Sequence, residues 1–193
     1  MVHEDFYPIS ESEALITVGS TYTRLNEIRK VKYKVEGHKV ILLESTLYLQ
    51  GIHMRLGNIF EGKLFYSDNN RLYYFDKGIG SLELQGEQPY ATNLGLFYTH
   101  NRSVYLNDNV IISLWEDFDE IGNVCVDSDW IYFETRRKKN PAPQGWEIWK
   151  FNINTKEKQQ VVKHGANPDI YSGKLYYSIW GERGFETVMK ELI

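Results

Sequence analysis

Short runs of alternating apolar and polar residues recur along the chain, and most of them end at a polar turn. Four runs are closely alike and a fainter fifth lies upstream, with matching apolar residues at Val31, Leu64, Leu96, Ile131 and Leu175. Such runs, rich in Tyr, Phe and β-branched residues, are typical of β-strands. The best helix candidate, residues 24–34, loses its apolar stripe after one turn. The pattern therefore predicts an all-β protein built from a repeated unit.

A second strand is expected after each run. The predicted hairpins join 30–36 with 38–44, 63–68 with 71–76, 95–100 with 102–107, 130–136 with 145–152 and 174–180 with 185–192. Two further short strands separate successive hairpins, in most copies around a glycine. Four strands per repeat, five times over, predict a single five-bladed β-propeller over residues 1–193, with four-stranded antiparallel blades. A β-sandwich or open barrel would explain the strands but leaves the repeat unexplained.

The expected blades span about 20–50, 52–85, 87–116, 122–163 and 166–193. The last of these has only three strands, whereas the segment Ala14–Val18 is an unused strand near the N-terminus. A bare sheet edge invites aggregation. We therefore expect strand 14–18 to complete the C-terminal blade and close the ring; a loose N-terminal arm is the alternative.

The segment Asn167-Pro168-Asp169-Ile170, followed by a Tyr-rich strand, resembles blades of the TolB-like propellers. The resemblance covers the repeats from about 54 to 193 but is sharp only in the last; the third blade keeps the proline and has Tyr90 in place of Asp169. It implies a scaffold, which in most TolB-like propellers is a platform for binding proteins. Propellers as a class also include lectins and glycosidases, so the fold alone does not settle function.

Composition narrows the function classes. The net charge of −4 argues against a surface for nucleic acid. A single cysteine, Cys125, excludes an intrachain disulfide and a thiolate metal cluster. The acidic N-terminus and the lack of a long apolar run predict no signal peptide and no membrane span, hence a cytoplasmic protein.

The first strand of each blade in a propeller lines a central channel. The channel candidates are Arg24, Asn26, Arg55, Asn58, Tyr90, Thr92, Asp127, Asn167 and Asp169. Arg24 and Arg55 occupy similar places, in Thr-Arg-Leu and Met-Arg-Leu, so their guanidinium groups could together bind a small anion. Pairing of these arginines with nearby acids is the alternative.

The loops on one face of a propeller converge from a rigid frame and often bind. Here a basic insertion, 136–145, lies one loop from an acidic stretch, 116–120. The candidates on this face are Arg136, Arg137, Lys138, Lys139, Trp146 and Trp180. The alternatives are that the two charged stretches pair with each other and that the tryptophans pack between blades.

Catalysis has little support in the sequence. The five histidines lack metal-ligand spacing, and no nucleotide-binding or nucleophile motif is present. Asp127 and Asp169 could stand at the separation that glycoside hydrolysis needs, but the short loops build no cleft. We expect a non-enzymatic protein without cofactor or metal that binds a protein partner, as an adaptor, inhibitor or immunity-type protein. A lectin-like module and a small-anion binder are the alternatives, and a glycoside hydrolase is less favoured.

Overall fold

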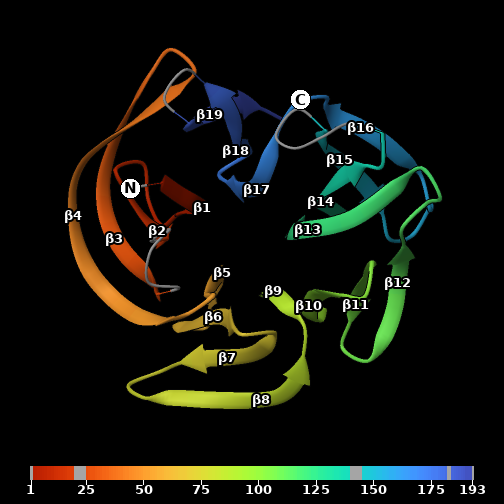
Figure 1. Cartoon of the computed structure of the whole chain (residues 1–193), viewed down its shortest axis with the longest axis horizontal. Helices are drawn as coiled ribbons and strands as arrows, with labels where there is room; N and C mark the ends of the chain where they lie inside the picture. Colours follow the sequence, from red (N-terminus) through yellow and green to blue (C-terminus); the bar gives the residue numbers. More distant parts are fainter. Residues whose placement is uncertain (1, 20–24, 140–144, 182–183, 193) are drawn as a thin grey trace.

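The computed structural model describes residues 2–19, 25–139, 145–181 and 184–192, and in these ranges all regular structure is β-strand. Three four-stranded antiparallel sheets and one seven-stranded sheet surround a common centre (Figure 1). The four-stranded sheets are β5 (Arg55–Phe60) to β8 (Ile79–Gln85), β9 (Glu87–Thr92) to β12 (Asn109–Ser113), and β13 (Phe118–Asp127) to β16 (Lys158–Val162). Between these lie β6 (Lys63–Asp68), β7 (Arg71–Phe75), β10 (Gly95–His100), β11 (Ser103–Leu106), β14 (Trp130–Arg137) and β15 (Trp146–Asn152).

The seven-stranded sheet has the order β1-β2-β3-β4-β19-β18-β17. Its strands are β1 (Val2–Pro8), β2 (Glu13–Gly19), β3 (Leu25–Glu36), β4 (Lys39–Ile52), β17 (Ala166–Tyr171), β18 (Lys174–Gly181) and β19 (Gly184–Glu191). Its two parts meet where Val188 is the register partner of Lys39 and where the Met189 N–H donates to the His38 carbonyl at 2.8 Å. The N-terminal and C-terminal strands are therefore joined at the tip of the β3–β4 hairpin.

The strands nearest the centre are the first strands of the three four-stranded sheets, together with β1 and β17 of the seven-stranded sheet. Contacts lead from β1 to β5, β9, β13 and β17 in turn, and from β17 back to β1, which closes a ring. Each is bulged against its second strand, at His3/Phe6, Leu56/Ile59, Glu87/Tyr90, Ile121/Val124 and Ala166/Asp169. Bulges at matching places increase the local twist and bend of the strands. Radial sheets of this kind make the fold a β-propeller.

The five predicted hairpins are confirmed as β3–β4, β6–β7, β10–β11, β14–β15 and β18–β19. The predicted place of strand 14–18 is wrong. This segment lies within β2, between β1 and β3, with Ala14 paired to both Pro8 and Val31. Residues 2–8 form an unforeseen first strand, so residues 14–18 already have two neighbours and cannot pair with the last strand.

The core lies between neighbouring sheets. Phe6, Tyr33 and Tyr176 pack edge to face and stacked between β1, β3 and β18, with ring centroids 5.2 to 6.3 Å apart. Close approach near the centre requires small residues. A Cβ atom at Gly57 would lie 1.9 Å from the Pro89 carbonyl oxygen, so only glycine lets β5 approach β9 this closely.

Candidate functional site

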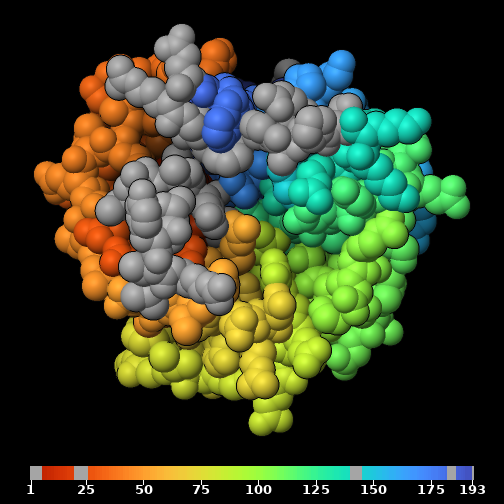
Figure 2. All heavy atoms as spheres, viewed as in Figure 1, coloured from red at the N-terminus to blue at the C-terminus, as the bar shows by residue number. Residues whose placement is uncertain are grey.

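Side chains fill the middle of the ring on the face shown in Figure 2. A cavity of about 20 Å³ remains between the first strands. Its lining residues are Phe6, Tyr7, Leu56, Gly57, Tyr90, Asn123, Val124, Asn167, Pro168 and Asp169. Such a volume holds about one water molecule. The cavity by itself is too small for a sugar or an organic anion.

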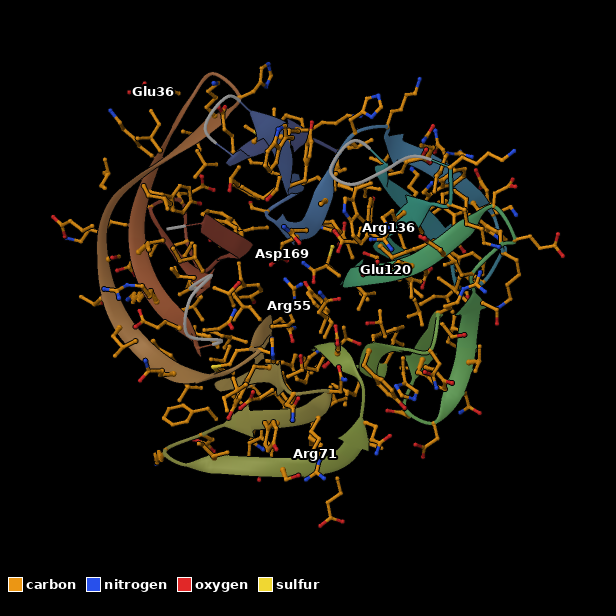
Figure 3. All side chains as sticks on the ribbon, in the orientation of Figure 1. Glu36, Arg55, Arg71, Glu120, Arg136 and Asp169 are labelled. Carbon is orange, nitrogen blue, oxygen red and sulfur yellow. The ribbon has the colours of Figure 1, made fainter. Side chains whose placement is uncertain are left out.

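The channel candidates fall into different positions. Asn58, Tyr90, Asn167 and Asp169 lie within first strands, and Arg55 begins one; Figure 3 shows Arg55 and Asp169 around the centre. Thr92 and Asp127 lie at strand ends, next to the turns into β10 and β14. The prediction that Asn26 lines the channel is wrong, because Asn26 lies in β3, and β2 separates β3 from β1. Arg24 lies outside the described residues.

Asn58 joins two neighbouring sheets. Its side-chain amide donates to the Ala91 carbonyl and its oxygen accepts from the Ala91 N–H, both at 2.8 Å. The residue is buried. Since both functions of the amide are used on the backbone of β9, Asn58 acts as a fastener between β5 and β9.

A second fastener joins β13 to β17. The Asn123 side-chain amide donates to the Asn167 side-chain oxygen at 3.0 Å. The buried carboxylate of Glu134 accepts from the backbone N–H groups of both Asn123, at 3.1 Å, and Asn167. A Cβ atom at Gly122 would lie 1.9 Å from this carboxylate, so glycine makes room for it. Glu134 was not among the predicted site residues; its place among apolar residues of a predicted strand was the available signal.

The two carboxylates considered for hydrolysis lie in different environments. Asp169 is buried and accepts a hydrogen bond from the Ile170 N–H at 2.7 Å, whereas Asp127 is exposed. Burial, reinforced by the charge of Asp169, raises the pKa of Tyr90 well above its ordinary value. The centre of the ring is therefore a packed polar cluster with little open space.

The acidic stretch and the basic insertion meet at Arg136. Its guanidinium binds Asp119 at 3.1 Å and Glu120 at 2.7 Å, and lies 5.6 Å from the centroid of the Trp146 ring. Figure 3 shows Arg136 beside Glu120. The hydrogen bond with Asp119 raises the pKa of Arg136. The pairing that was left open as an alternative is the arrangement in the structure.

Arg137 is also engaged within the chain. It pairs with Glu147 and lies 4.8 Å from the centroid of the Phe118 ring. Glu147 is buried and also accepts from the Trp149 indole N–H at 3.0 Å and the Gln160 amide at 2.7 Å. Glu147 was not among the predicted site residues. It is the centre of the cluster that anchors the basic insertion.

Three of the predicted loop-face residues, Lys138, Lys139 and Trp180, are exposed to solvent. We define the loop face as the side of the propeller that carries the β6–β7, β10–β11, β14–β15 and β18–β19 connections. Lys138 and Lys139 are exposed at the end of β14, and Trp180, near the end of β18, is 55% exposed. β14 and β18 belong to consecutive parts of the ring, since β13 contacts β17. Trp180 and the two lysines therefore lie on the same face, in consecutive parts of the ring.

An exposed apolar surface was not foreseen. Along β4, the side chains of Leu42, Leu43, Leu47, Tyr48 and Ile52 are 39 to 57% exposed. We call these five residues the β4 edge patch. Their sequence was read as ordinary strand, because an apolar run does not itself reveal whether a neighbour covers it.

Two general features concern the described residues alone. Among them, no group of three or more His, Cys, Asp or Glu side chains is placed to hold a metal ion. The same residues contain no helix with the length and apolar character needed to cross a membrane.

No protein-family model and no curated relative matches the sequence. Among solved structures, the chain is similar to one in the crystal structure of a Nidogen/Laminin complex, with a TM-score of 0.59 and 12% identity. The match covers 99% of this chain and 76% of the other. At this identity the similarity shows the fold alone, and the resemblance to TolB-like blades stays a prediction.

Proposed function

We propose that this chain is a non-enzymatic, five-bladed propeller that binds a protein partner through its loop face. The partner would meet Trp180 and the lysines at the end of β14. An adaptor, an inhibitor or an immunity-type protein would each use such a surface. The small cavity and short connections favour binding of a macromolecule over chemistry on a small substrate.

The count of five rests on dividing the seven-stranded sheet in two. Its parts, β1–β4 and β17–β19, share one pair of register partners, Val188 and Lys39. Five first strands with matching bulges support the same division. In this interpretation the first blade spans residues 2–52, and the last blade receives the tip of the β3–β4 hairpin at its outer edge.

The observation that carries the proposal is the exposure of Trp180. Tryptophan is enriched among the residues that dominate protein–protein binding energy, because it buries a large area with few rotatable bonds. Arg136 and Arg137 pair with their own acids, whereas Lys138 and Lys139 are exposed cations at the end of β14. A partner with an acidic rim around an apolar pocket fits both features.

The structural neighbour adds a weaker analogy. It belongs to a Nidogen/Laminin complex, so a chain of similar fold is present in a protein–protein assembly. The analogy concerns the type of activity and says nothing about which partner this chain binds.

Affinity capture tests the proposal. The wild-type chain and two variants, Trp180→Ala and Lys138→Glu/Lys139→Glu, are used to capture proteins from a lysate of the source cells. Leu94→Ala is the matched control, because Leu94 is 53% exposed in the β9–β10 turn on the opposite face. Substitutions at exposed positions usually change stability by less than about 0.5 kcal/mol, so each variant is expected to fold.

The expected result is a protein captured by wild type and Leu94→Ala and lost, or reduced at least tenfold, with both loop-face variants. Equal capture by all four chains would contradict the role of the loop face. Absence of any specific protein in the wild-type capture would contradict the function.

A further inference from the structure

The outermost strand of the first blade is unusually long and open. β4 has 14 residues and forms the outer arc beside β3 in Figure 1. On its other side it meets β19 only at Lys39. From Val40 to Gly51, no described strand pairs with the edge of β4 that faces away from β3. Its outward backbone groups are available for pairing with another strand.

Lysine, proline and short length, which protect many sheet edges, are missing here, although β4 is bulged against β3 near Leu43 and Tyr48. Residues 40–52 contain no Lys, Arg or Pro, and their only charged side chain is Glu44. By comparison, the outer strands β12 and β16 have five residues each, and Lys158 begins β16. Short length and lysine are devices that prevent edge-to-edge pairing. Their absence from β4 favours a function for this edge.

The β4 edge patch is large enough to matter. Its five residues are each 39 to 57% exposed, and a contiguous apolar patch of a few hundred Å² is already among the largest that a typical monomer carries. A hollow of about 210 Å³ lies beside it, lined by Ile16, Val18, Arg29, Val31, Leu42, Leu43, Glu44 and Ser45. A stable interface buries about 800 Å² per partner, and a paired strand backbone with its flanking side chains supplies the remainder.

The sequence of β4 is self-complementary. Around Ser45, the apolar triplet Ile41-Leu42-Leu43 precedes Glu44, and the triplet Leu47-Tyr48-Leu49 follows Thr46. If two such strands run antiparallel with Ser45 opposite Ser45, the segment 44–47 between the two bulges of β4 pairs first. Leu43 then lies near Leu47 of the second copy, and Leu42 near Tyr48. Glu44 then faces Thr46, so no like charges oppose each other.

We propose that a second copy of this chain binds along β4, and that the two edges form one continuous antiparallel sheet centred on Ser45. A two-fold interface of this kind uses the same surface on both copies and closes on itself, which prevents open-ended growth. Because β4 lies at the rim, the dimer leaves both loop faces accessible.

Sedimentation or light scattering measures the mass of the full chain from about 1 to 100 µM, a range that covers ordinary micromolar affinities. The expected mass is that of two 22.7 kDa chains at the upper concentrations. Leu43→Lys/Leu47→Lys places lysines of the two copies close together. It is expected to raise the dissociation constant of the dimer at least a hundredfold, so that the variant is monomeric. Ile79→Lys is the control, since Ile79 is 64% exposed on the outer strand β8 and is expected to leave the dimer intact.

A cysteine variant tests the register and does not depend on mass. Opposite residues of an antiparallel pair lie about 4.5–5.5 Å apart, within reach of a disulfide. Ser45→Cys is expected to form a covalent dimer on mild oxidation, whereas Val110→Cys, at an exposed position of the β12 edge, is not. The native Cys125 is buried and does not compete.

Three results would overturn the proposal. They are a wild-type monomer at every concentration, a dimer that survives Leu43→Lys/Leu47→Lys, and a Ser45→Cys variant that does not cross-link. The first would leave the edge to a strand from a different protein, and the second would place the dimer contact elsewhere.

Discussion

Lys39 and Val188 are register partners, although one lies at the tip of the first outer hairpin and the other in the last strand. The Lys39 ammonium also binds the Glu186 carboxylate at 2.8 Å. Since Lys39 is exposed, this ion pair contributes little stability. Apolar packing contributes more: Val40 and Met189 pack against the cluster that contains Phe6, Tyr33 and Tyr176. The seven-stranded sheet is therefore closed by a hairpin tip that lies over the aromatic cluster of Phe6, Tyr33 and Tyr176.

Asn58→Ala is expected to destabilise the fold by about 2–3 kcal/mol, because it leaves the buried N–H and carbonyl of Ala91 without their partner. Chemical denaturation measures the change. Asn109→Ala, at an exposed position of β12, is the control and should stay within about 0.5 kcal/mol of wild type. If Asn58→Ala were as stable as Asn109→Ala, Asn58 would not fasten β5 to β9.

Glu147→Ala is expected to cost about 3 kcal/mol, since the Arg137 guanidinium, the Trp149 indole and the Gln160 amide all lose a buried acceptor. Glu147→Gln keeps an acceptor oxygen without the charge and should lie between Glu147→Ala and wild type. The free energy of unfolding from urea titrations orders the three proteins. The opposite order for the two variants would show that burying a polar group at this position costs more than its hydrogen bonds return.

Stability is expected to fall in alkali because of buried tyrosines. Burial raises the pKa of Tyr7 and of Tyr66 to about 12, against about 10 in the unfolded chain. A raised folded-state pKa gives stability that is complete below pH 10 and is lost as the pH rises from 10 to 12. Thermal midpoints across this window, with tyrosinate absorbance, measure the loss.

Tyr66→Phe removes one of these phenols and should make the alkaline decline shallower than in wild type. A decline of the same slope in Tyr66→Phe would assign the alkaline loss to other groups.

Cys125 is expected to resist thiol reagents in the folded protein. It is 1% exposed, and burial, with the charges of Asp169 and Asp127, raises its pKa well above the ordinary value. The reactive thiolate is therefore both scarce and covered. Modification followed by mass spectrometry should become fast only where denaturant unfolds the chain. Rapid modification in native buffer would mean that the ring opens locally between β9, β13 and β17.

The hairpins could be predicted because alternating residues and polar turns are local signals. The join between the N-terminal and C-terminal strands could not be predicted from the sequence. The first strand, residues 2–8, carries acids and ends in Pro8, so it lacks the apolar pattern of its counterparts. The join between β4 and β19 depends on a pairing of distant residues, Lys39 and Val188, that leaves no periodic trace.

The candidate site was predicted in part. The charges of Arg136 and its acids are close in the sequence pattern, so their pairing could be considered beforehand. The roles of Asn58 and Asn167 as fasteners needed coordinates, because their partners lie on the next first strand. Glu134 was missed for the same reason, whereas the partners of Glu147 lie within its own sheet. The β4 edge patch was missed because exposure depends on what covers a strand.

The place of the open β4 edge follows from closure of the seven-stranded sheet by the tip of the β3–β4 hairpin against β19. A disulfide between Lys39→Cys and Val188→Cys measures that closure, since paired residues in an antiparallel ladder are at bridging distance. We predict that the variant cross-links within one chain and gains about 2–4 kcal/mol of stability, while Thr17→Cys/Val188→Cys does not cross-link. Efficient cross-linking of the Thr17 pair, with none between positions 39 and 188, would contradict the closure described here.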